Sequence, residues 1–380
     1  MDMARNSRAL SQTVFECSGQ RYDPDDPRLH TACSQTWHNR LCAVDSKKLE
    51  GALLGLVRYL IRGKWFDEAR VCGCLAVAVD GTLQEKIRSA TLSEKEKCRF
   101  ALEARIVTPW GWNIPVLFEP VEPYEGEKEK QDCEMAAFKR LEKRLKAAFP
   151  HQGLCILGDA LYACRPVVDI CRRNGWEYIL VFKEGSSPNV YRQVHGAMAE
   201  RDNTFAMMRK AEDGTDQCVG RGEWIDASEA QYDSGSPLCG WVVTCRQWHP
   251  FDECYDGEFL TSFPVNDGGR ARLIAEWGRR RWNIENGFHA EKHGGFGLEH
   301  TFCNDSTASR NLHVVMEIAY ALWQVFDMGM LKRLAKGKRK VTQEGWAKLL
   351  FAAILIVGFY EIGGFSVAVP VRRMSREHLR

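Results

Sequence analysis

Two aspartates follow apolar runs of the sequence at points where a carboxylate is costly unless it is used. Asp80 follows the run Cys72–Val79, and Asp159 follows Leu154–Gly158. Carboxylates are seldom tolerated beside the core of a sheet unless they pair, cap a helix or bind a metal ion. Taken singly, a turn or a helix cap explains each aspartate better than a catalytic role does, and Asp80-Gly81-Thr82 has the composition of a turn. Together they predict acidic groups at the ends of two buried strands.

A third acidic residue, Glu285, lies in a segment with helical periodicity that we expect to run unbroken from residue 270 to 293. At about 100° per residue, Arg281, Glu285 and Lys292 fall on one narrow stripe of this helix. That stripe borders an apolar one, so the three side chains are expected at the rim of the buried face, where a cleft would lie. The alternative is an exposed row of ion pairs, because Arg281 and Glu285 are i,i+4 partners.

Three carboxylates from two strand ends and a helix suit metal-dependent phosphoryl transfer. They can hold two Mg²⁺ or Mn²⁺ ions about 3.5–4 Å apart, one activating water or a 3′-hydroxyl and the other stabilising the leaving oxygen. Oxygen ligands favour these ions over zinc, and Arg281 and Lys292 would offset phosphate charge. A glycoside hydrolase that uses two of the same carboxylates is a different class that stays open, and it predicts no metal requirement.

The surrounding pattern predicts an α/β fold. Residues 49–61 form a helical stripe, residues 105–107 and 114–118 form a hairpin, and residues 154–182 read as strand, helix and strand. Such a β-α-β unit implies parallel strands with a right-handed crossover. Ligands bind at the carboxyl ends of parallel strands, so Lys183, which follows the second strand, is expected near Asp159.

The chain divides into five expected parts. In order, they are a helical N-terminal unit for DNA binding or dimerisation (1–70), the first part of a catalytic core (71–183), a β-rich insertion (184–268), the second part of the core (269–330), and a basic and apolar C-terminal segment (331–380).

The amino-acid composition argues against some classes of protein but does not identify a binding partner. Among 380 residues, Lys and Arg total 52 and Asp and Glu total 50, so local patches must decide nucleic-acid binding. The 15 cysteines include no C-x-x-C pair, which argues against a zinc ribbon or a disulfide scaffold and for reduced thiols in the cytoplasm. The longest uncharged apolar stretch, 349–360, falls short of the roughly 18 residues that a spanning helix needs, so no membrane segment is expected.

Two basic runs are candidate phosphate contacts. Arg279-Arg280-Arg281 lies next to Glu285, and residues 332–340, which include Lys338 and Arg339, contain no acid. Clusters of this kind fit the salt-dependent binding of nucleic-acid backbones. For the second run, a solvated loop explains the charges equally well.

The motifs VAVDGT, LGDALYA and RWNIENGFHAEK, in this order, resemble the DDE transposases of bacterial insertion sequences. More narrowly, they resemble the group with the signature Y-x2-R-x3-E-x6-K, over roughly residues 72–325. The resemblance implies an RNase H-like mixed sheet with flanking helices, interrupted by a mostly β insertion before the last catalytic helix. It also implies that Asp80, Asp159 and Glu285 are the catalytic residues that bind two Mg²⁺ or Mn²⁺ ions.

The resemblance extends to the partners. It implies that Arg281 and Lys292 contact DNA phosphates, and we expect the same of Arg280, Lys183, Lys338 and Arg339. It implies double-stranded DNA as the substrate, both the terminal inverted repeats of an element and target DNA, and a homodimer in a synaptic complex in the bacterial nucleoid. The tyrosine of the signature falls on Gly278. A catalytically decayed or domesticated DNA-binding protein is the alternative function.

Relatives use an aromatic residue of the insertion to stabilise a flipped base during hairpin formation. The residues of this chain that could do so are Trp224, Trp241 and Trp248. The sequence does not choose among them, and a packing role in the core explains each of them better.

Overall fold

The computed structural model describes residues 34–86, 98–121, 130–211, 213–248, 255–294, 296–300 and 303–326. The chain separates into a unit of residues 40–336 and a unit of residues 1–39 with 337–380. In the second unit only residues 34–39, the start of helix α2 (Ser34–Ala43), are described. Residues 1–33 of the expected N-terminal unit and the whole segment 331–380 therefore lie outside the described residues. Within the described ranges, no helix is long and apolar enough to cross a membrane.

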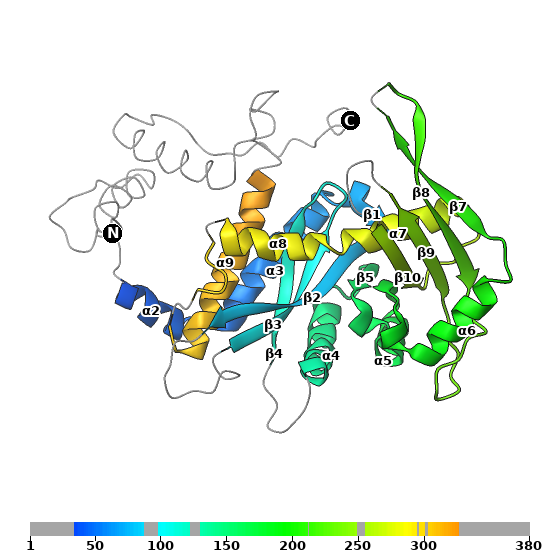
Figure 1. Cartoon of the computed structure of the whole chain (residues 1–380). Helices are drawn as coiled ribbons and strands as arrows, with labels where there is room; N and C mark the ends of the chain where they lie inside the picture. The colour runs from blue at the N-terminus through cyan, green and yellow to red at the C-terminus, as the bar shows by residue number, and fades with distance from the viewer. Residues whose placement is uncertain are drawn as a thin grey trace. The chain divides into compact units, whose positions relative to one another are not determined.

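One mixed sheet of ten strands forms the framework of the larger unit (Figure 1). Its main path runs in the order β4-β3-β2-β5-β6-β10-β9-β8-β7, and β1 pairs with β2 off this path. The strands are β1 (Arg70–Val71), β2 (Cys74–Lys86), β3 (Cys98–Val107), β4 (Asn113–Val121), β5 (Leu154–Gly158), β6 (Glu177–Val181), β7 (Thr204–Lys210), β8 (Asp216–Asp226), β9 (Trp241–Gln247) and β10 (Tyr255–Thr261).

The first half of this path has the strand order of an RNase H-like fold. β4, β3 and β2 are antiparallel neighbours, and β5 and β6 follow in parallel to β2. The crossover between the two parallel strands is helix α5 (Arg165–Asn174), which ends at Gly175 with φ 67°. Glycine adopts this left-handed conformation without strain. The predicted fold class and the predicted β-α-β unit are confirmed.

The insertion extends the same sheet. It begins with helix α6 (Pro188–Met198), and then β7 to β10 form an antiparallel meander that joins the core where β10 pairs with β6. Figure 1 shows this half of the sheet continuing from the core, with the β7–β8 hairpin projecting beyond it. The insertion is therefore mostly β, as expected, and shares hydrogen bonds with the catalytic core.

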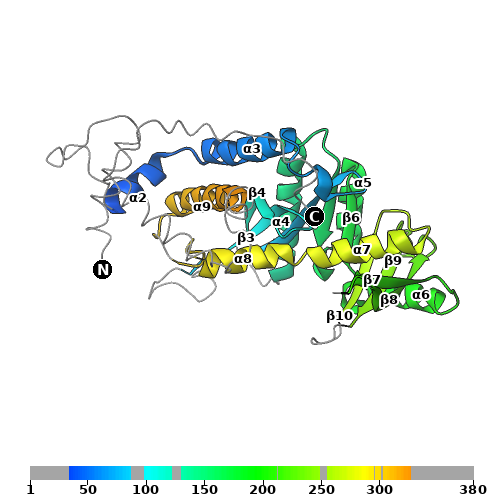
Figure 2. The same cartoon turned by 90° about the horizontal axis from the view of Figure 1, so that it is seen from above.

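Helices cover both faces of the sheet (Figure 2). Leu75, Val77 and Val79 of β2 face a core that includes α4 (Lys130–Ala148) and α5, while Ala76 and Ala78 face a core that includes α7 (Gly268–Arg280) and α8 (Asn283–His293). The other described helices are α3 (Ser46–Arg62), α9 (Ser306–Phe326) and the short helices η2 (Asp67–Ala69), η3 (Ala160–Tyr162) and η4 (Glu184–Ser186). Since side chains alternate along a strand, Asp80 belongs to the face covered by α7 and α8.

Asp80 does not end its strand, contrary to the prediction from the apolar run. β2 continues through Asp80 and Gly81 to Lys86, because β3 supplies a pairing partner all along this stretch, with Asp80 opposite Glu103. On its other side, the pairing of β2 with β5 ends at Ala78. Asp80 therefore lies where β2 has lost one neighbour, so that edge of the strand is open.

The helix predicted for residues 270–293 is interrupted. Helix α7 ends at Arg280 and α8 begins at Asn283, and backbone hydrogen bonds at the junction span three residues, such as Ile284 N to Arg281 O at 3.0 Å. Such tight bonds bend the path of a helix. The close packing of α7 on the insertion accompanies this bend, since a Cβ atom at Gly278 would lie 2.3 Å from Cδ1 of Phe259.

We expect the substitution Gly278→Ala to destabilise the protein, because the added methyl group overlaps the Phe259 ring. Overpacking of this kind costs about 1–3 kcal/mol of unfolding free energy, measured by urea denaturation. The control is Gly55→Ala on the exposed face of α3, where nothing lies within 4 Å of the new methyl group; it should stabilise by about 0.5–1 kcal/mol. Equal effects of the two substitutions would contradict the close contact.

Candidate active site

Asp80 and Asp159 come from neighbouring parallel strands. The last paired residues of these strands are Ala78 and Leu157, and each aspartate lies two residues further along its chain, on the face covered by α7 and α8. Asp80 accepts a hydrogen bond from Gly81 N at 2.8 Å. Asp159 accepts one from Leu161 N at 2.9 Å and so caps η3. The backbone holds one oxygen of each carboxylate.

Arg281 connects Glu285 to Asp80. Its guanidinium lies 2.7 Å from Oε1 of Glu285 and 3.4 Å from Oδ2 of Asp80. Arg281 is only 7% exposed, whereas the Glu285 side chain is 42% exposed. The structure therefore brings Glu285 within the span of one guanidinium of Asp80, although the two residues are far apart in sequence.

The three carboxylates act on one another electrostatically. Burial raises the pKa of Asp80 to about 6, Arg281 opposes this rise, and Asp159 and Glu285 add to it. Like-charged groups in a partly buried site disfavour joint ionisation, and a divalent cation relieves that repulsion. The donor set, which consists of carboxylate oxygens alone, suits Mg²⁺ or Mn²⁺.

The other expected contact residues lie in different settings. Lys183 is exposed just after β6, in a turn fixed beside Asp159 by the Ser186 hydroxyl, which donates to Ala160 O at 2.7 Å. Lys292 forms an ion pair with Glu299 at 2.6 Å. Arg280 stacks over the Trp277 ring at 4.9 Å. Lys338 and Arg339 lie outside the described residues.

Of the tryptophans considered in the insertion, two are packing residues. Trp224 and Trp241 are partly buried against the core that includes α7, whereas Trp248 is 39% exposed at the end of β9. Sequence reasoning missed a more exposed tryptophan, Trp282, which is 55% exposed directly after Arg281. The position of Trp282 directly after Arg281 of the signature was a signal that could have identified it. The sequence, however, predicted one continuous helix over residues 270–293, and such a helix gives no reason to expect a kink that exposes Trp282.

Trp282 borders a hollow of about 550 Å³ between the kink and the insertion. The residues that line it combine aromatic, amide and cationic groups: Met207, Met208, Arg209, Val219, Gln247, Tyr255, Glu276, Arg279, Arg280, Trp282, Asn283 and Asn286. Arg279 stacks over Tyr255 at 4.7 Å. Aromatic rings interleaved with arginines are typical of surfaces that bind nucleic acid.

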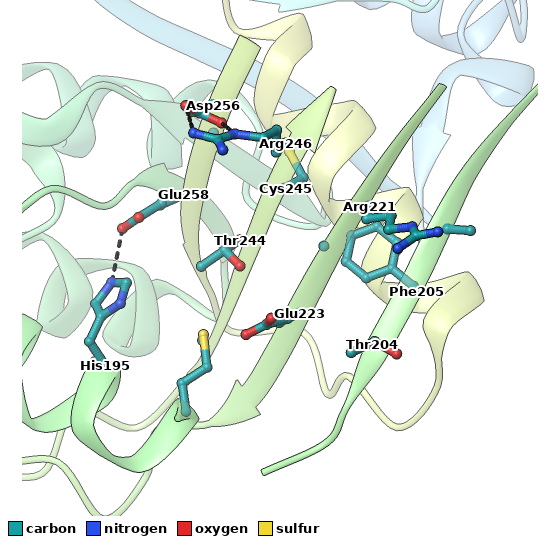
Figure 3. A pocket seen from close by; sticks show the side chains of 14 residues that line it. His195, Thr204, Phe205, Arg221, Glu223, Thr244, Cys245, Arg246, Asp256 and Glu258 are labelled. Carbon is teal, nitrogen blue, oxygen red and sulfur yellow. Dashed lines mark hydrogen bonds and ion pairs between the residues drawn. The ribbon is translucent and has the colours of Figure 1, made fainter. Parts of the chain in front are cut away.

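A larger hollow of about 780 Å³ lies on the opposite face of the insertion sheet, beside α6 (Figure 3). Arg221 and Glu223 of β8 face it, Arg246 pairs with Asp256 at 2.7 Å, and His195 of α6 contacts Glu258 at 3.2 Å. None of the residues that line it belongs to the carboxylate site. Its charges of both signs indicate a solvated sheet face.

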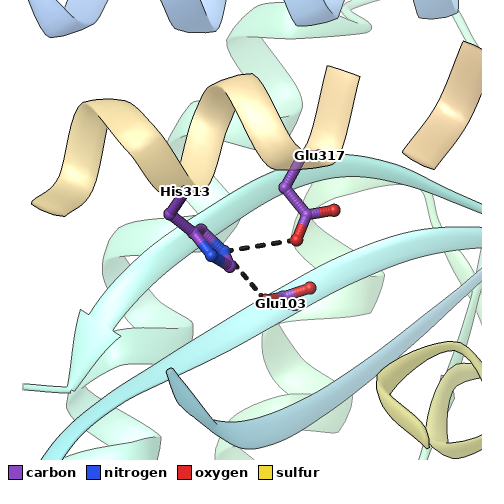
Figure 4. A group of neighbouring side chains, drawn as sticks. All are labelled: Glu103, His313 and Glu317. Atoms are coloured by element: carbon purple, nitrogen blue, oxygen red, sulfur yellow. Dashed lines mark hydrogen bonds and ion pairs between the residues drawn. The ribbon is translucent and has the colours of Figure 1, made fainter. Parts of the chain in front are cut away.

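Beneath α8 lies a buried ionic cluster that the sequence did not reveal. The Arg105 guanidinium of β3 contacts Glu103 at 2.5 Å, Glu291 of α8 at 2.6 Å and Glu317 of α9 at 3.2 Å. His313 of α9 lies 3.1 Å from Glu103 and 3.3 Å from Glu317 (Figure 4). The cluster joins the sheet to the helix that carries Glu285.

Within the described ranges, Glu103, His313 and Glu317 are the one group whose metal-ligating atoms all lie within 4.8 Å of one another. Arg105 already supplies the cation there. Burial alone would raise the pKa of Glu103, but Arg105 and His313 lower it to about 2. Burial raises the pKa of Glu317 well above its usual range, and the Arg105 guanidinium opposes this rise. We therefore interpret the group as a structural network and not as a metal centre.

Glu134 and Tyr162 border the carboxylate site from the other face of the sheet. A Cβ atom at Gly81, the neighbour of Asp80, would lie 3.1 Å from Oε1 of Glu134 on α4. Tyr162 is 1% exposed, and its hydroxyl has no hydrogen-bond partner among the described residues. Burial first, and then the charges of Glu134, Asp159 and Asp80, raise the pKa of this hydroxyl well above its usual range.

Comparison with known proteins gives one family. The family model described as "Transposase DDE domain" matches residues 132–350, a range that includes Asp159 and Glu285. No curated protein matches the sequence. Among solved structures, a cryo-EM structure of the piggyBac transposase synaptic complex with hairpin DNA is similar, with a TM-score of 0.41 and 7% identity. The match covers 78% of this chain and 56% of the piggyBac chain.

The ionic cluster gives a prediction about stability. Arg105→Met leaves the buried carboxylates of Glu103 and Glu291 without their cation, which should cost about 3–5 kcal/mol of unfolding free energy at pH 7. The control is Arg272→Met, which removes an exposed i,i+4 ion pair with Glu276 and should change stability by no more than about 0.5 kcal/mol. Urea denaturation measures both, and a loss below about 1 kcal/mol for Arg105→Met would contradict the role of the cluster.

Proposed function

The chain belongs to the transposase DDE domain family, and from this premise we propose that it is the transposase of an insertion sequence. It binds the ends of the element and catalyses metal-dependent cleavage and transfer of DNA strands. The observation that carries the proposal is that three carboxylates from distant segments lie in one region. Asp80 and Asp159 are each two residues past the last pair between β2 and β5. Arg281 contacts both Asp80 and Glu285.

Asp80, Asp159 and Glu285 would hold two Mg²⁺ or Mn²⁺ ions. Their fit rests on the chemistry of the donors, which are oxygens only. It rests also on the raised pKa of Asp80, about 6, which burial causes first and the charges of Asp159 and Glu285 increase. When bound, the ions supply Lewis-acid stabilisation of the phosphoryl group and an activated oxygen nucleophile.

The protein's own groups orient these carboxylates. Gly81 N and Leu161 N each donate to one oxygen of an aspartate, which fixes the direction of the other oxygen. Arg281 does the same for Glu285 through its contact at 2.7 Å. Because the Arg281 guanidinium lies against Asp80, its charge also opposes the rise that burial causes in the pKa of that aspartate.

The DNA path runs along the α7–α8 kink in this proposal. Arg280 and Trp282 line the hollow at the kink, and both lie within five residues of Glu285 in the sequence. Lys183 stands beside Asp159, and Lys292 would exchange Glu299 for a DNA phosphate. The substrates are the terminal inverted repeats and target DNA, and the active form is a homodimer in a synaptic complex in the cytoplasm. Lys338 and Arg339 are proposed as further phosphate contacts from their sequence alone.

The boundaries of the parts of the chain stay proposals as well. We propose a DNA-binding or dimerisation unit at 1–70, a catalytic core at 71–183 and 269–330, an insertion at 184–268 and a C-terminal segment at 331–380. The second and third of these share one sheet, so the insertion would move with the core as one body.

A catalytically decayed or domesticated DNA-binding protein is a second candidate function, and Gly278 favours it. No side chain fits at this signature position, because even a Cβ atom would overlap Phe259. The contact that a tyrosine makes in the signature is therefore missing. Strand transfer by the purified protein would exclude this candidate, and DNA binding without metal-dependent nicking would support it.

We predict that Asp159→Asn removes Mg²⁺-dependent nicking of DNA that carries the element ends. The loss should exceed the roughly 10- to 100-fold cost of removing an outer partner of a metal ligand, because a ligand itself is lost. The control is Asp169→Asn, a change to an exposed aspartate of α5 whose partner is Arg165 at 3.4 Å. Unchanged nicking by Asp159→Asn would remove this residue from the mechanism, and chelator-resistant hydrolysis of oligosaccharides would restore the glycosidase hypothesis.

We predict that Trp282→Ala weakens DNA binding by about 1–3 kcal/mol through loss of base stacking, with the salt dependence of binding unchanged. Arg280→Gln should instead lower the slope of log K for DNA binding against log salt concentration by about 1, because one phosphate contact is lost. The comparison is Trp248→Ala, since Trp248 is exposed but lies outside the hollow. A larger loss for Trp248→Ala than for Trp282→Ala would place the stacking residue in the insertion.

A further inference from the structure

Glu134 approaches the catalytic carboxylates from the face of the sheet opposite to Glu285. It lies on α4, which packs against β4 and β3, and its Oε1 atom is 3.1 Å from the position of a Cβ at Gly81. Gly81 directly follows Asp80, where β2 has already lost β5 as a neighbour. Carboxylates from both faces of the sheet can therefore meet over this open edge of β2.

The absence of a side chain at position 81 is what admits the Glu134 carboxylate to this place. A contact of 3.1 Å with a Cβ is tighter than nine in ten real ones, so a side chain at position 81 would shift the Glu134 carboxylate by a few tenths of an ångström. Gly81 has no positive φ that would require glycine for its backbone. Its lack of a side chain thus serves the close approach of Glu134.

Tyr162 provides an independent indication of a ligand site. Its hydroxyl is buried, has no partner within the described part of the chain, and lies within electrostatic reach of Glu134, Asp159 and Asp80. A buried hydroxyl without a partner is costly, and native structures seldom contain one. A site that fills with a hydrated cation would provide the missing acceptor, since water bound there offers oxygen atoms among the carboxylates.

A role at the start of the helix explains Glu134 less well. Helix α4 begins at Lys130, so Glu134 lies past the first turn, where the helix dipole has little effect. The position instead directs the carboxylate at the strand that carries Asp80.

We infer that Glu134 is a fourth acidic residue of the catalytic site and contributes an oxygen ligand to a divalent ion on the Asp80 side, with the Tyr162 hydroxyl facing the same space. This inference rests on the proposed function, because it assigns Glu134 to the site of Asp80, Asp159 and Glu285. It extends the site across both faces of the sheet.

The experiment measures binding of Mn²⁺ alone to the full-length protein by isothermal titration, without DNA, and nicking of element-end DNA separately. Glu134→Gln keeps the shape of the side chain but removes its negative charge, and it should weaken Mn²⁺ binding by at least the roughly 10-fold that loss of an outer partner of a ligand costs. Gly81→Ala should weaken it as well, by displacing an intact Glu134. Asp169→Asn is the control for loss of a carboxylate and should bind Mn²⁺ as the unchanged protein does. Circular dichroism verifies that each variant is folded.

The outcomes separate the two proposals. Weaker Mn²⁺ binding by Asp159→Asn, Glu134→Gln and Gly81→Ala, with unchanged binding by Asp169→Asn, supports the fourth acidic residue. If Asp159→Asn loses Mn²⁺ and nicking while Glu134→Gln binds Mn²⁺ normally, Glu134 is excluded and the proposed function stands. If Asp159→Asn also binds Mn²⁺ and nicks DNA normally, the proposed function fails and the inference falls with it. Should Glu134→Gln not fold, Gly81→Ala decides on the same criterion.

Discussion

The position of Glu285 depends on a charge that never reaches the solvent. Arg105 lies inside the sheet-helix interface and binds carboxylates of β3, α8 and α9 at once. A buried guanidinium with several acidic partners tolerates little displacement, because moving any partner leaves a charge unpaired in a medium of low polarity. Helix α8 is therefore fixed to the strand next to β2, and its first turn presents Glu285 to Asp80 as a consequence.

Two glycines allow α7 and α8 to pack closely on the sheet. At Gly287 of α8, a Cβ atom would lie 2.1 Å from Oδ1 of Asn113 and 2.8 Å from Nη1 of Arg105. At Gly278 of α7, the same atom would enter the Phe259 ring. One helix thus packs on the core of the sheet and the other on the insertion. The kink at Arg281 allows α8 to pack on the core of the sheet while α7 packs on the insertion. The same kink leaves Trp282 exposed.

The sequence predicted the elements better than their limits. The two strands on either side of α5 could be predicted because each is a short apolar run. The helix between them could be predicted because Pro166 marks its start and Gly175 its end. All of these signals are local in the sequence. The continuation of β2 past Asp80 could not be predicted from the local sequence, because it depends on pairing with residues of β3 that lie further along the chain. The kink at Arg281 and the buried charges were hidden for the same reason. Glu317 and His313 stand in a segment that reads as apolar, and only the position of Arg105 explains their burial.

The near balance of charge in the composition conceals a local separation that the fold creates. Carboxylates gather at the open edge of β2, and arginines gather along the kink that follows. Arg281 belongs to both groups, because it is the third of three consecutive arginines and also the partner of Asp80 and Glu285. An acidic site that must admit a polyanion needs cations at its border. Here a single helix boundary places them there, so the same kink that orients Glu285 also prepares the approach of a phosphate backbone.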